Sequence, residues 1–170
     1  IVFIGTFDYR KGCLDWRDVI TLVSESFPQV RLKLIGTRGM CQSADEVYRF
    51  FPKSMHKRIT VTPQFAPEML PGLLDGCSIG VFPSYREGFG IGVVEMLAAG
   101  LPVVAYDAPG PCDILPKDWL VPRGDRISLS NKIISLLSET QQSRLTQQAR
   151  SVAEQFIWSK VARQTYDCYE

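Results

Sequence analysis

Short apolar runs alternate with longer helical stretches along most of this 170-residue chain. Several of the short runs are apolar without interruption, as expected for strands that are covered by helices on both faces of a sheet. This alternation is typical of βαβ units, which place parallel strands side by side. The sequence therefore predicts an α/β domain with a Rossmann-like parallel sheet and helices on both faces.

The expected strands cover residues 1–5, 30–36, 58–62, 78–83, 101–106 and 119–122. The expected helices cover residues 13–27, 44–53, 67–76, 92–100, 127–138, 141–156 and 158–169. At about 150 residues per domain, residues 1–170 are expected to form one domain. The sequence begins at Ile1, inside the first strand and without an initiator Met, so we expect a fragment of a longer protein.

Charge and composition exclude several classes of function. Nineteen basic and 18 acidic residues leave a net charge of +1, which provides no long-range field for binding nucleic acid or an anionic membrane. No apolar run reaches the roughly 18 residues of a membrane span, and the start lacks the features of a signal peptide. The five Cys include no CxxC pair, and the single histidine, His56, has no ligand-like neighbours in sequence. We therefore expect a cytoplasmic location, reduced thiols, no metal site and a surface position for His56.

The loop after the first strand carries two adjacent cations. Arg10 and Lys11 precede Gly12 at the entrance to a helix. In an open α/β sheet, ligands bind beyond the carboxyl ends of the strands, where helix N–H groups and the helix dipole favour an anion. Lys11 would add a point charge. The segment predicts a phosphate site, although a solvated loop with a glycine before the helix would account for it too.

A second candidate loop, rich in glycine, follows the fourth strand. Gly88, Gly90 and Gly92 remove side chains from a strand-to-helix connection, so a ligand can approach the backbone and the first N–H groups of the helix. Glu87 and Glu95, eight residues apart, can face one crevice. Because carboxylates repel phosphate, their expected targets are the neutral hydroxyls at either end of a diphosphate-linked ligand, such as ribose and a second sugar.

At these loops the sequence resembles the C-terminal, donor-binding half of GT-B glycosyltransferases, specifically glycosyltransferase family 4. The resemblance rests on the E-x7-E element EGFGIGVVE, with FPS before it and MLAAGLPVVA after it, and on GTFDYRKG and FIWSKVARQTYDCYE. It covers nearly the whole chain. It implies transfer of a sugar, with retention of configuration, from a nucleotide-diphosphate sugar such as a UDP- or GDP-sugar to an acceptor hydroxyl. The acceptor would bind to an N-terminal half that this chain lacks, so the fragment alone is expected to be inactive.

The resemblance also implies roles for individual residues. Lys11 would contact the donor diphosphate, Glu87 the donor-sugar hydroxyls and Glu95 the ribose hydroxyls, which makes Lys11 and Glu87 the expected catalytic residues. Backbone N–H groups of the glycine-rich loop would hold the distal phosphate. The complete expected donor site comprises Gly5, Thr6, Arg10, Lys11, Arg38, Thr62, Gln64, Phe65, Glu87, Gly88, Phe89, Gly90, Ile91, Gly92 and Glu95.

Two positions depart from the family pattern. The family commonly has an Arg directly after the first-strand glycine, as a second diphosphate cation, and here Thr6 stands there. Arg10 or Arg38 is expected to substitute for it. The usual glycine after the third strand is replaced by Pro63, and the residues around it would flank the base, whose identity stays open.

Neither a metal nor a cofactor is expected. The sequence has no D-x-D pair to clamp a metal on the diphosphate, so Lys11 and a helix N-terminus would neutralise the departing group. Peripheral membrane association of the full-length protein stays open. The alternatives are an inactive nucleotide-sugar-binding or scaffold domain and a sugar-nucleotide epimerase. A phosphorylase would need a pyridoxal-linked lysine, which is not identifiable, and a dinucleotide oxidoreductase would need its GxGxxG after the first strand rather than the fourth.

Overall fold

The computed structural model describes residues 1–169, and a six-stranded sheet forms its centre. All neighbouring strands pair in parallel, in the order β3-β2-β1-β4-β5-β6. The parallel α/β architecture expected from the sequence is therefore confirmed. The strands are β1 (Val2–Ile4), β2 (Leu32–Ile35), β3 (Ile59–Thr62), β4 (Gly80–Phe82), β5 (Val103–Tyr106) and β6 (Leu120–Val121).

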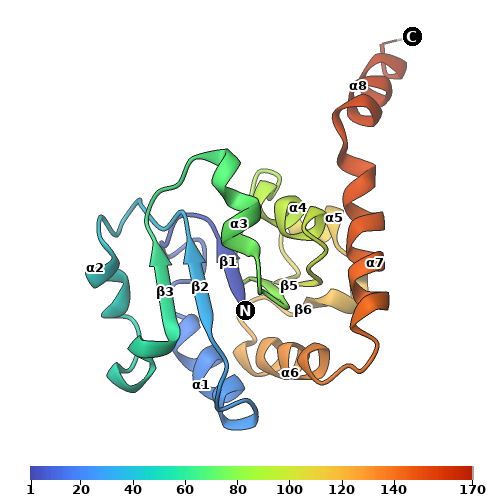
Figure 1. The fold of residues 1–170 in the computed structure, drawn as a ribbon. Coiled ribbons are helices and arrows are strands. Elements are labelled where there is room, and N and C mark those ends of the chain that lie inside the picture. The colour runs from blue at the N-terminus through green and yellow to red at the C-terminus, as the bar shows by residue number, and fades with distance from the viewer. Residues whose placement is uncertain (170) are drawn as a thin grey trace.

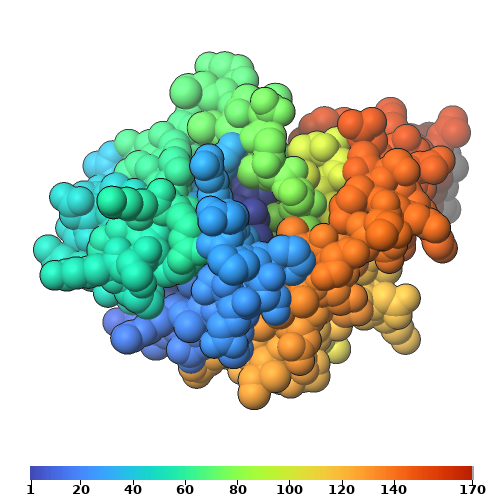
Figure 2. All heavy atoms as spheres, turned by 60° about the horizontal axis from the view of Figure 1, so that its bottom comes forward, coloured from blue at the N-terminus to red at the C-terminus, as the bar shows by residue number. Residues whose placement is uncertain are grey.

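Helices cover both faces of the sheet, as Figure 1 shows. On one face α1 and α6 pack against each other, and Figure 2 brings this face forward. On the other face α4 packs against β1, β4 and α7, while α8 extends away from the sheet. The helices are α1 (Trp16–Ser26), α2 (Ala44–Tyr48), α3 (Leu70–Leu74), α4 (Ile91–Ala98), α5 (Pro111–Ile114), α6 (Arg126–Leu137), α7 (Gln142–Ala153) and α8 (Trp158–Asp167).

The core explains why β1, β4 and β5 lack a polar face. Every residue of β1, β4 and β5 is buried, because helices cover both sides of these strands. On α1 the buried residues Trp16, Val19, Ile20 and Val23 follow the spacing of one helical face. None of the helices within residues 1–169 combines the length and apolar character needed to cross a membrane.

Two expected helices are much shorter than predicted. The stretch 44–53 forms only the five-residue α2, which passes into turns up to Phe51, and a separate 3-10 helix, Lys53–Arg58, begins after Pro52. The stretch 67–76 divides into a 3-10 turn, Pro67–Met69, and α3. The short helix α5 and the 3-10 turn Lys117–Trp119 were not predicted.

The structure shows the surroundings of His56 and of the five cysteines. His56 was expected at the surface, but it is half-buried. The centre of its ring lies 5.1 Å from that of Tyr48, and its Nε2 is 3.2 Å from the carbonyl oxygen of Phe51. All five cysteines are free thiols. Burial raises the pKa of the Cys13 thiol to about 12, so this group is a packed side chain rather than a nucleophile.

The strand order reverses between β1 and β4. The chain first builds β1, β2 and β3 outward on one side, then returns to the other side of β1 for β4, β5 and β6. The connections after β1 and β4 therefore leave the sheet in opposite directions. In parallel α/β sheets such a switch point leaves a crevice at the carboxyl ends of the strands.

Candidate functional site

A cavity of about 380 Å³ lies at this switch point. It is open to solvent and receives residues from the ends of β1 and β2, the segment after β3, and the loop that joins β4 to α4. Its lining residues are Ile4, Gly5, Lys11, Gly36, Phe65, Glu87, Phe89, Gly90, Ile91, Gly92 and Glu95. A larger cavity, of about 770 Å³, lies between α1 and the start of α6, but it holds none of the predicted site residues.

Lys11 and Glu87 form an ion pair inside the cavity. The Lys11 Nζ is 2.8 Å from the Glu87 Oε1, and the two side chains are only 13% and 8% exposed. The ammonium also lies 4.9 Å from the centre of the Phe82 ring, a cation–π distance. Lys11 therefore presents its charge from a fixed position rather than as a mobile surface group.

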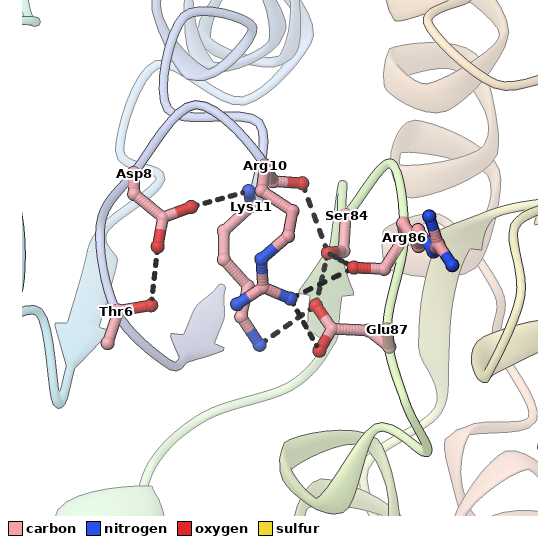
Figure 3. A network of polar contacts seen from close by, with 7 residues as sticks. All are labelled: Thr6, Asp8, Arg10, Lys11, Ser84, Arg86 and Glu87. Carbon is pink, nitrogen blue, oxygen red and sulfur yellow. Dashed lines mark hydrogen bonds and ion pairs between the residues drawn. The ribbon is translucent and has the colours of Figure 1, made fainter.

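Two further donors converge on Glu87 (Figure 3). The Arg10 Nη1 is 3.2 Å from the Glu87 Oε2 and also donates to the carbonyl oxygen of Arg86 at 3.0 Å. The Ser84 hydroxyl donates to the Glu87 Oε1. Since a carboxylate offers about four acceptor positions, three donors leave Glu87 little capacity for a ligand. The sequence placed this carboxylate on sugar hydroxyls, whereas the structure shows it engaged by protein groups.

The loop that carries Lys11 is fixed by hydrogen bonds to Asp8 before it and by the packing of Gly12 after it. The Asp8 carboxylate accepts hydrogen bonds from the Thr6 hydroxyl at 2.8 Å and from the Lys11 backbone N–H at 2.9 Å, a turn motif typical of aspartate. Gly12 has a φ of +76°, and a Cβ there would overlap the carbonyl oxygen of Pro83. The loop after β1 thus lies directly against the end of β4.

The glycine-rich loop brings the start of α4 into the cavity. Gly90 precedes the helix with a φ of +105°, a backbone conformation that favours glycine. A Cβ on Gly92 would lie 2.9 Å from the Ile4 carbonyl oxygen, so glycine lets α4 approach the end of β1 closely. The first N–H groups of a helix have no acceptor within the helix. On α4 the N–H groups of Ile91 and Gly92 belong to cavity-lining residues and are suited to bind an anion, whereas that of Val93 donates to the Gly90 carbonyl oxygen.

Glu95 differs from Glu87 in its surroundings. It lines the same cavity from α4 and is half-buried, and burial raises the pKa of its carboxyl above the ordinary value. Within residues 1–169 no hydrogen-bond donor or cation contacts this carboxylate. Glu95 therefore offers unoccupied acceptors to a ligand.

A second cavity, of about 420 Å³, adjoins the first and shares Gly36 and Phe65 with it. Across it the Arg38 Nη1 donates to the Gln64 Oε1 at 2.5 Å, and the Arg38 Nε donates to the Gln42 Oε1 at 3.3 Å. These side chains present planar polar groups next to an aromatic ring.

The structure brings most of the predicted site together. The residues that line the first cavity as expected are Gly5, Lys11, Phe65, Glu87, Phe89, Gly90, Ile91, Gly92 and Glu95, while Arg38 and Gln64 line the second. Thr6, Arg10, Thr62 and Gly88 line neither. Of the two candidate substitutes for the missing family arginine, Arg10 lies beside Lys11 and Arg38 faces the second cavity.

Sequence reasoning missed several contributors. Ile4 and Gly36 line the first cavity, Gly39 and Gln42 line the second, and Ser84 contacts Glu87. Gly36 carried a usable signal, because it directly follows a strand and its loop meets the same edge of the sheet. Its φ is +75°, and a Cβ there would lie 3.1 Å from the Phe65 ring.

Comparison with known proteins gives these features a context. The family described as glycosyl transferases group 1 matches residues 1–139. The phosphatidyl-myo-inositol mannosyltransferase of Mycobacterium leprae is 29% identical over 176 residues, which cover 100% of this chain and 46% of that protein.

Solved structures agree with this match. Sucrose-phosphate synthase from Thermosynechococcus elongatus has a TM-score of 0.78 and 28% identity, over 99% of this chain and 44% of that one. The Anabaena protein HepE, solved with UDP and glucose, has a TM-score of 0.80 and 22% identity, over 99% and 47%. The chain thus spans less than half the length of these proteins. Its fold is that of the GT-B glycosyltransferases, and the match over residues 1–139 shows that the chain belongs to the glycosyl transferases group 1 family.

Proposed function

We propose that this chain is the C-terminal, donor-binding domain of a retaining family 4 glycosyltransferase. The whole enzyme would transfer a sugar from a nucleotide-diphosphate sugar to an acceptor hydroxyl. The observation that carries the proposal is one cavity that holds a fixed cation, Lys11, the N–H groups of Ile91 and Gly92 at the start of α4, and the carboxylate of Glu95. Among residues 1–169 that carboxylate has no partner. The solved HepE complex supports it, because that protein of the same fold was solved with UDP and glucose.

In this proposal Lys11 and the start of α4 hold the diphosphate. When the bond between the anomeric carbon and the phosphate oxygen breaks, its electron pair and the negative charge move onto the departing diphosphate. A lysine ammonium has three N–H donors. Because Glu87 accepts one of them, the others remain for phosphate oxygens. A charge fixed before the reaction stabilises the developing anion without reorganisation at that moment.

The two carboxylates would then act differently. Glu95 has free acceptors and would bind the ribose hydroxyls, whose hydrogen bonds favour the ionised carboxylate and offset its burial. Glu87 would orient Lys11 and use its remaining acceptor position on a donor-sugar hydroxyl. Arg10 would supply the second cation that the family has at the position of Thr6.

The second cavity would hold the base. Phe65 separates it from the diphosphate cavity and offers a ring for stacking, while Arg38 and Gln64 offer donors and acceptors to the base edge. The acceptor would bind to the part of the enzyme outside this chain. We propose that diphosphate binding needs no metal ion, since Lys11 and the α4 N-terminus would supply the positive charge.

Calorimetric titration of the 170-residue chain with UDP, GDP and their sugar conjugates tests the proposal. We expect dissociation constants from micromolar to millimolar for at least one nucleotide, about −8 to −4 kcal/mol. Lys11→Ala should weaken binding by roughly tenfold or more, because a hydrogen bond to a charged group contributes about 1.5–3 kcal/mol. Lys57→Ala is the matched control, since Lys57 is exposed in the 3-10 turn before β3, away from the carboxyl ends of the strands.

Two results would contradict the proposal. One is that no nucleotide binds, and the other is that Lys11→Ala and Lys57→Ala weaken binding equally. Sugar transfer to simple acceptors, assayed in parallel, should be absent because this chain positions no acceptor hydroxyl.

A further inference from the structure

Two segments that carry the candidate site run against each other. Residues 10–15 follow β1 and residues 83–87 follow β4. The backbone N–H of Tyr85 donates to the Arg10 carbonyl oxygen at 2.8 Å, and Gly12 packs against Pro83. Lys11 and Glu87 form their ion pair between the same two segments. The relative position of these segments therefore sets the geometry of the pair.

Asp15, at the end of the first segment, is the most buried carboxylate near the site. It is 2% exposed and directly precedes α1, but its side chain does not cap that helix. Its Oδ2 instead accepts from the hydroxyls of Tyr85, at 2.8 Å, and Tyr106, at 2.9 Å. Its Oδ1 pairs with the Arg126 Nε at 3.0 Å. One carboxylate thus joins the β4 loop, strand β5 and helix α6.

We propose that Asp15 is a positioning residue, which holds the Tyr85 hydroxyl and thereby fixes the segment 83–87 with Glu87 facing Lys11. Asp15 lies four residues after Lys11, and Tyr85 lies two residues before Glu87. The hydrogen bond between Asp15 and Tyr85 therefore joins the two segments that carry Lys11 and Glu87. The functional meaning of this inference rests on the proposed function, in which Lys11 and Glu87 contact the donor.

The surroundings of Asp15 keep its hydrogen bonds with the two tyrosine hydroxyls intact at neutral pH. Burial and the hydrogen bond to Asp15 raise the pKa of Tyr85, and burial together with the charge of Asp15 raises that of Tyr106. Both phenols therefore stay protonated and donate at neutral pH. Tyr106 is part of β5 and 0% exposed, so it anchors Asp15 to the sheet, whereas Tyr85 connects Asp15 to the loop.

The two tyrosines form a matched pair for a test. Tyr85→Phe and Tyr106→Phe each remove one hydroxyl from the same carboxylate oxygen, but only Tyr85 belongs to the site segment. The readout is hydrogen exchange at the amides of residues 85 and 87, which donate to the carbonyl oxygens of Arg10 and Pro109. We expect exchange about fivefold faster in Tyr85→Phe, from the loss of one hydrogen bond. In Tyr106→Phe the Asp15 carboxylate keeps its contacts with Tyr85 and Arg126, so these two amides should exchange at close to the wild-type rate.

Equal acceleration in both variants, or none in Tyr85→Phe, would overturn the inference. Thermal unfolding of each variant shows whether the change is local. If Tyr106→Phe does not fold, Arg126→Gln replaces it as control, because it leaves both hydroxyls on Oδ2 and removes the partner of Oδ1. Asp18→Asn is measured beside it, since Arg126 also pairs with Asp18.

A second experiment tests whether the hydrogen bond between Asp15 and Tyr85 affects ligand binding. With UDP or GDP, whichever binds the wild-type chain, Tyr85→Phe should weaken binding about threefold to tenfold, and Tyr106→Phe by less than about twofold. Equal weakening by both variants would contradict a positioning role. If the wild-type chain binds no nucleotide, the proposed function fails, while the exchange measurement still decides whether Asp15 fixes the segment.

Discussion

Replacing Gly12 by alanine tests how closely the two site loops must approach. Gly12 has a φ of +76°, and a residue with a side chain in this left-handed region costs about 1–2 kcal/mol. In addition, the new Cβ would overlap the Pro83 carbonyl oxygen, and overpacking adds about 1–3 kcal/mol. The total, about 2–5 kcal/mol, is a large part of the stability of a domain of this size.

Gly76 provides the control for the backbone contribution. Its φ is +69°, but a Cβ there would have no neighbour within 4 Å among residues 1–169, so Gly76→Ala should lose only the conformational part. At about 2–4 °C per kcal/mol for a domain of 150–250 residues, the Gly12 variant should unfold about 2–12 °C below the Gly76 variant. Scanning calorimetry of the two variants and the wild type measures this difference. Equal unfolding temperatures for the two variants would refute the close approach of the loops as the reason for glycine.

Three further changes test the charges of the site. Burial raises the pKa of Glu95 in the folded state, so ionisation of this carboxyl destabilises the fold at pH values above the pKa of the unfolded chain, about 4.3. Glu95→Gln should therefore raise the unfolding temperature at pH 7, and this gain should shrink as the pH falls and vanish below about 4.3. A gain that is unchanged at pH 3 would contradict the reasoning. Glu87→Gln should lower the unfolding temperature at pH 7 by about 3–12 °C, because Lys11 and Arg10 lose their counter-charge. Glu68→Gln, at an exposed position, should change it little, and equal effects of the two changes would show that the ion pair contributes nothing. Nucleotide affinity measured by calorimetry should be the same with and without EDTA, and a loss that Mg²⁺ restores would refute metal-independent binding.

The centre of the sheet was predictable because β1, β4 and β5 are buried on both faces. Runs such as residues 1–5 and 101–106 are apolar throughout, and this signal needs no knowledge of the partner strands. The observed strands are shorter at their ends, since residues such as Gly5 belong to the loops that form the cavity. The convergence of these loops followed from one rule, that parallel strands end at the same edge.

The pairing of individual side chains was not predictable. Lys11 and Glu87 were assigned to two different parts of the ligand, but they contact each other across the strand switch point. Arg10 and Arg38 could not be distinguished as substitutes for the family arginine, because side-chain direction in a loop follows no period. Asp15 gave no signal, because its partners Tyr85 and Tyr106 lie 70 and 91 residues away in sequence.

The central position of β1 has a consequence for synthesis of the chain on the ribosome. β1 is hydrogen-bonded to β2 on one side and to β4 on the other, yet β4 begins only at Gly80. While residues 1–79 are being made, one edge of an entirely apolar strand has no partner, and such edges readily pair with other chains. Translation arrested before residue 80 should therefore yield aggregation-prone nascent chains, whereas arrest after β6, which covers the other edge of β5, should not.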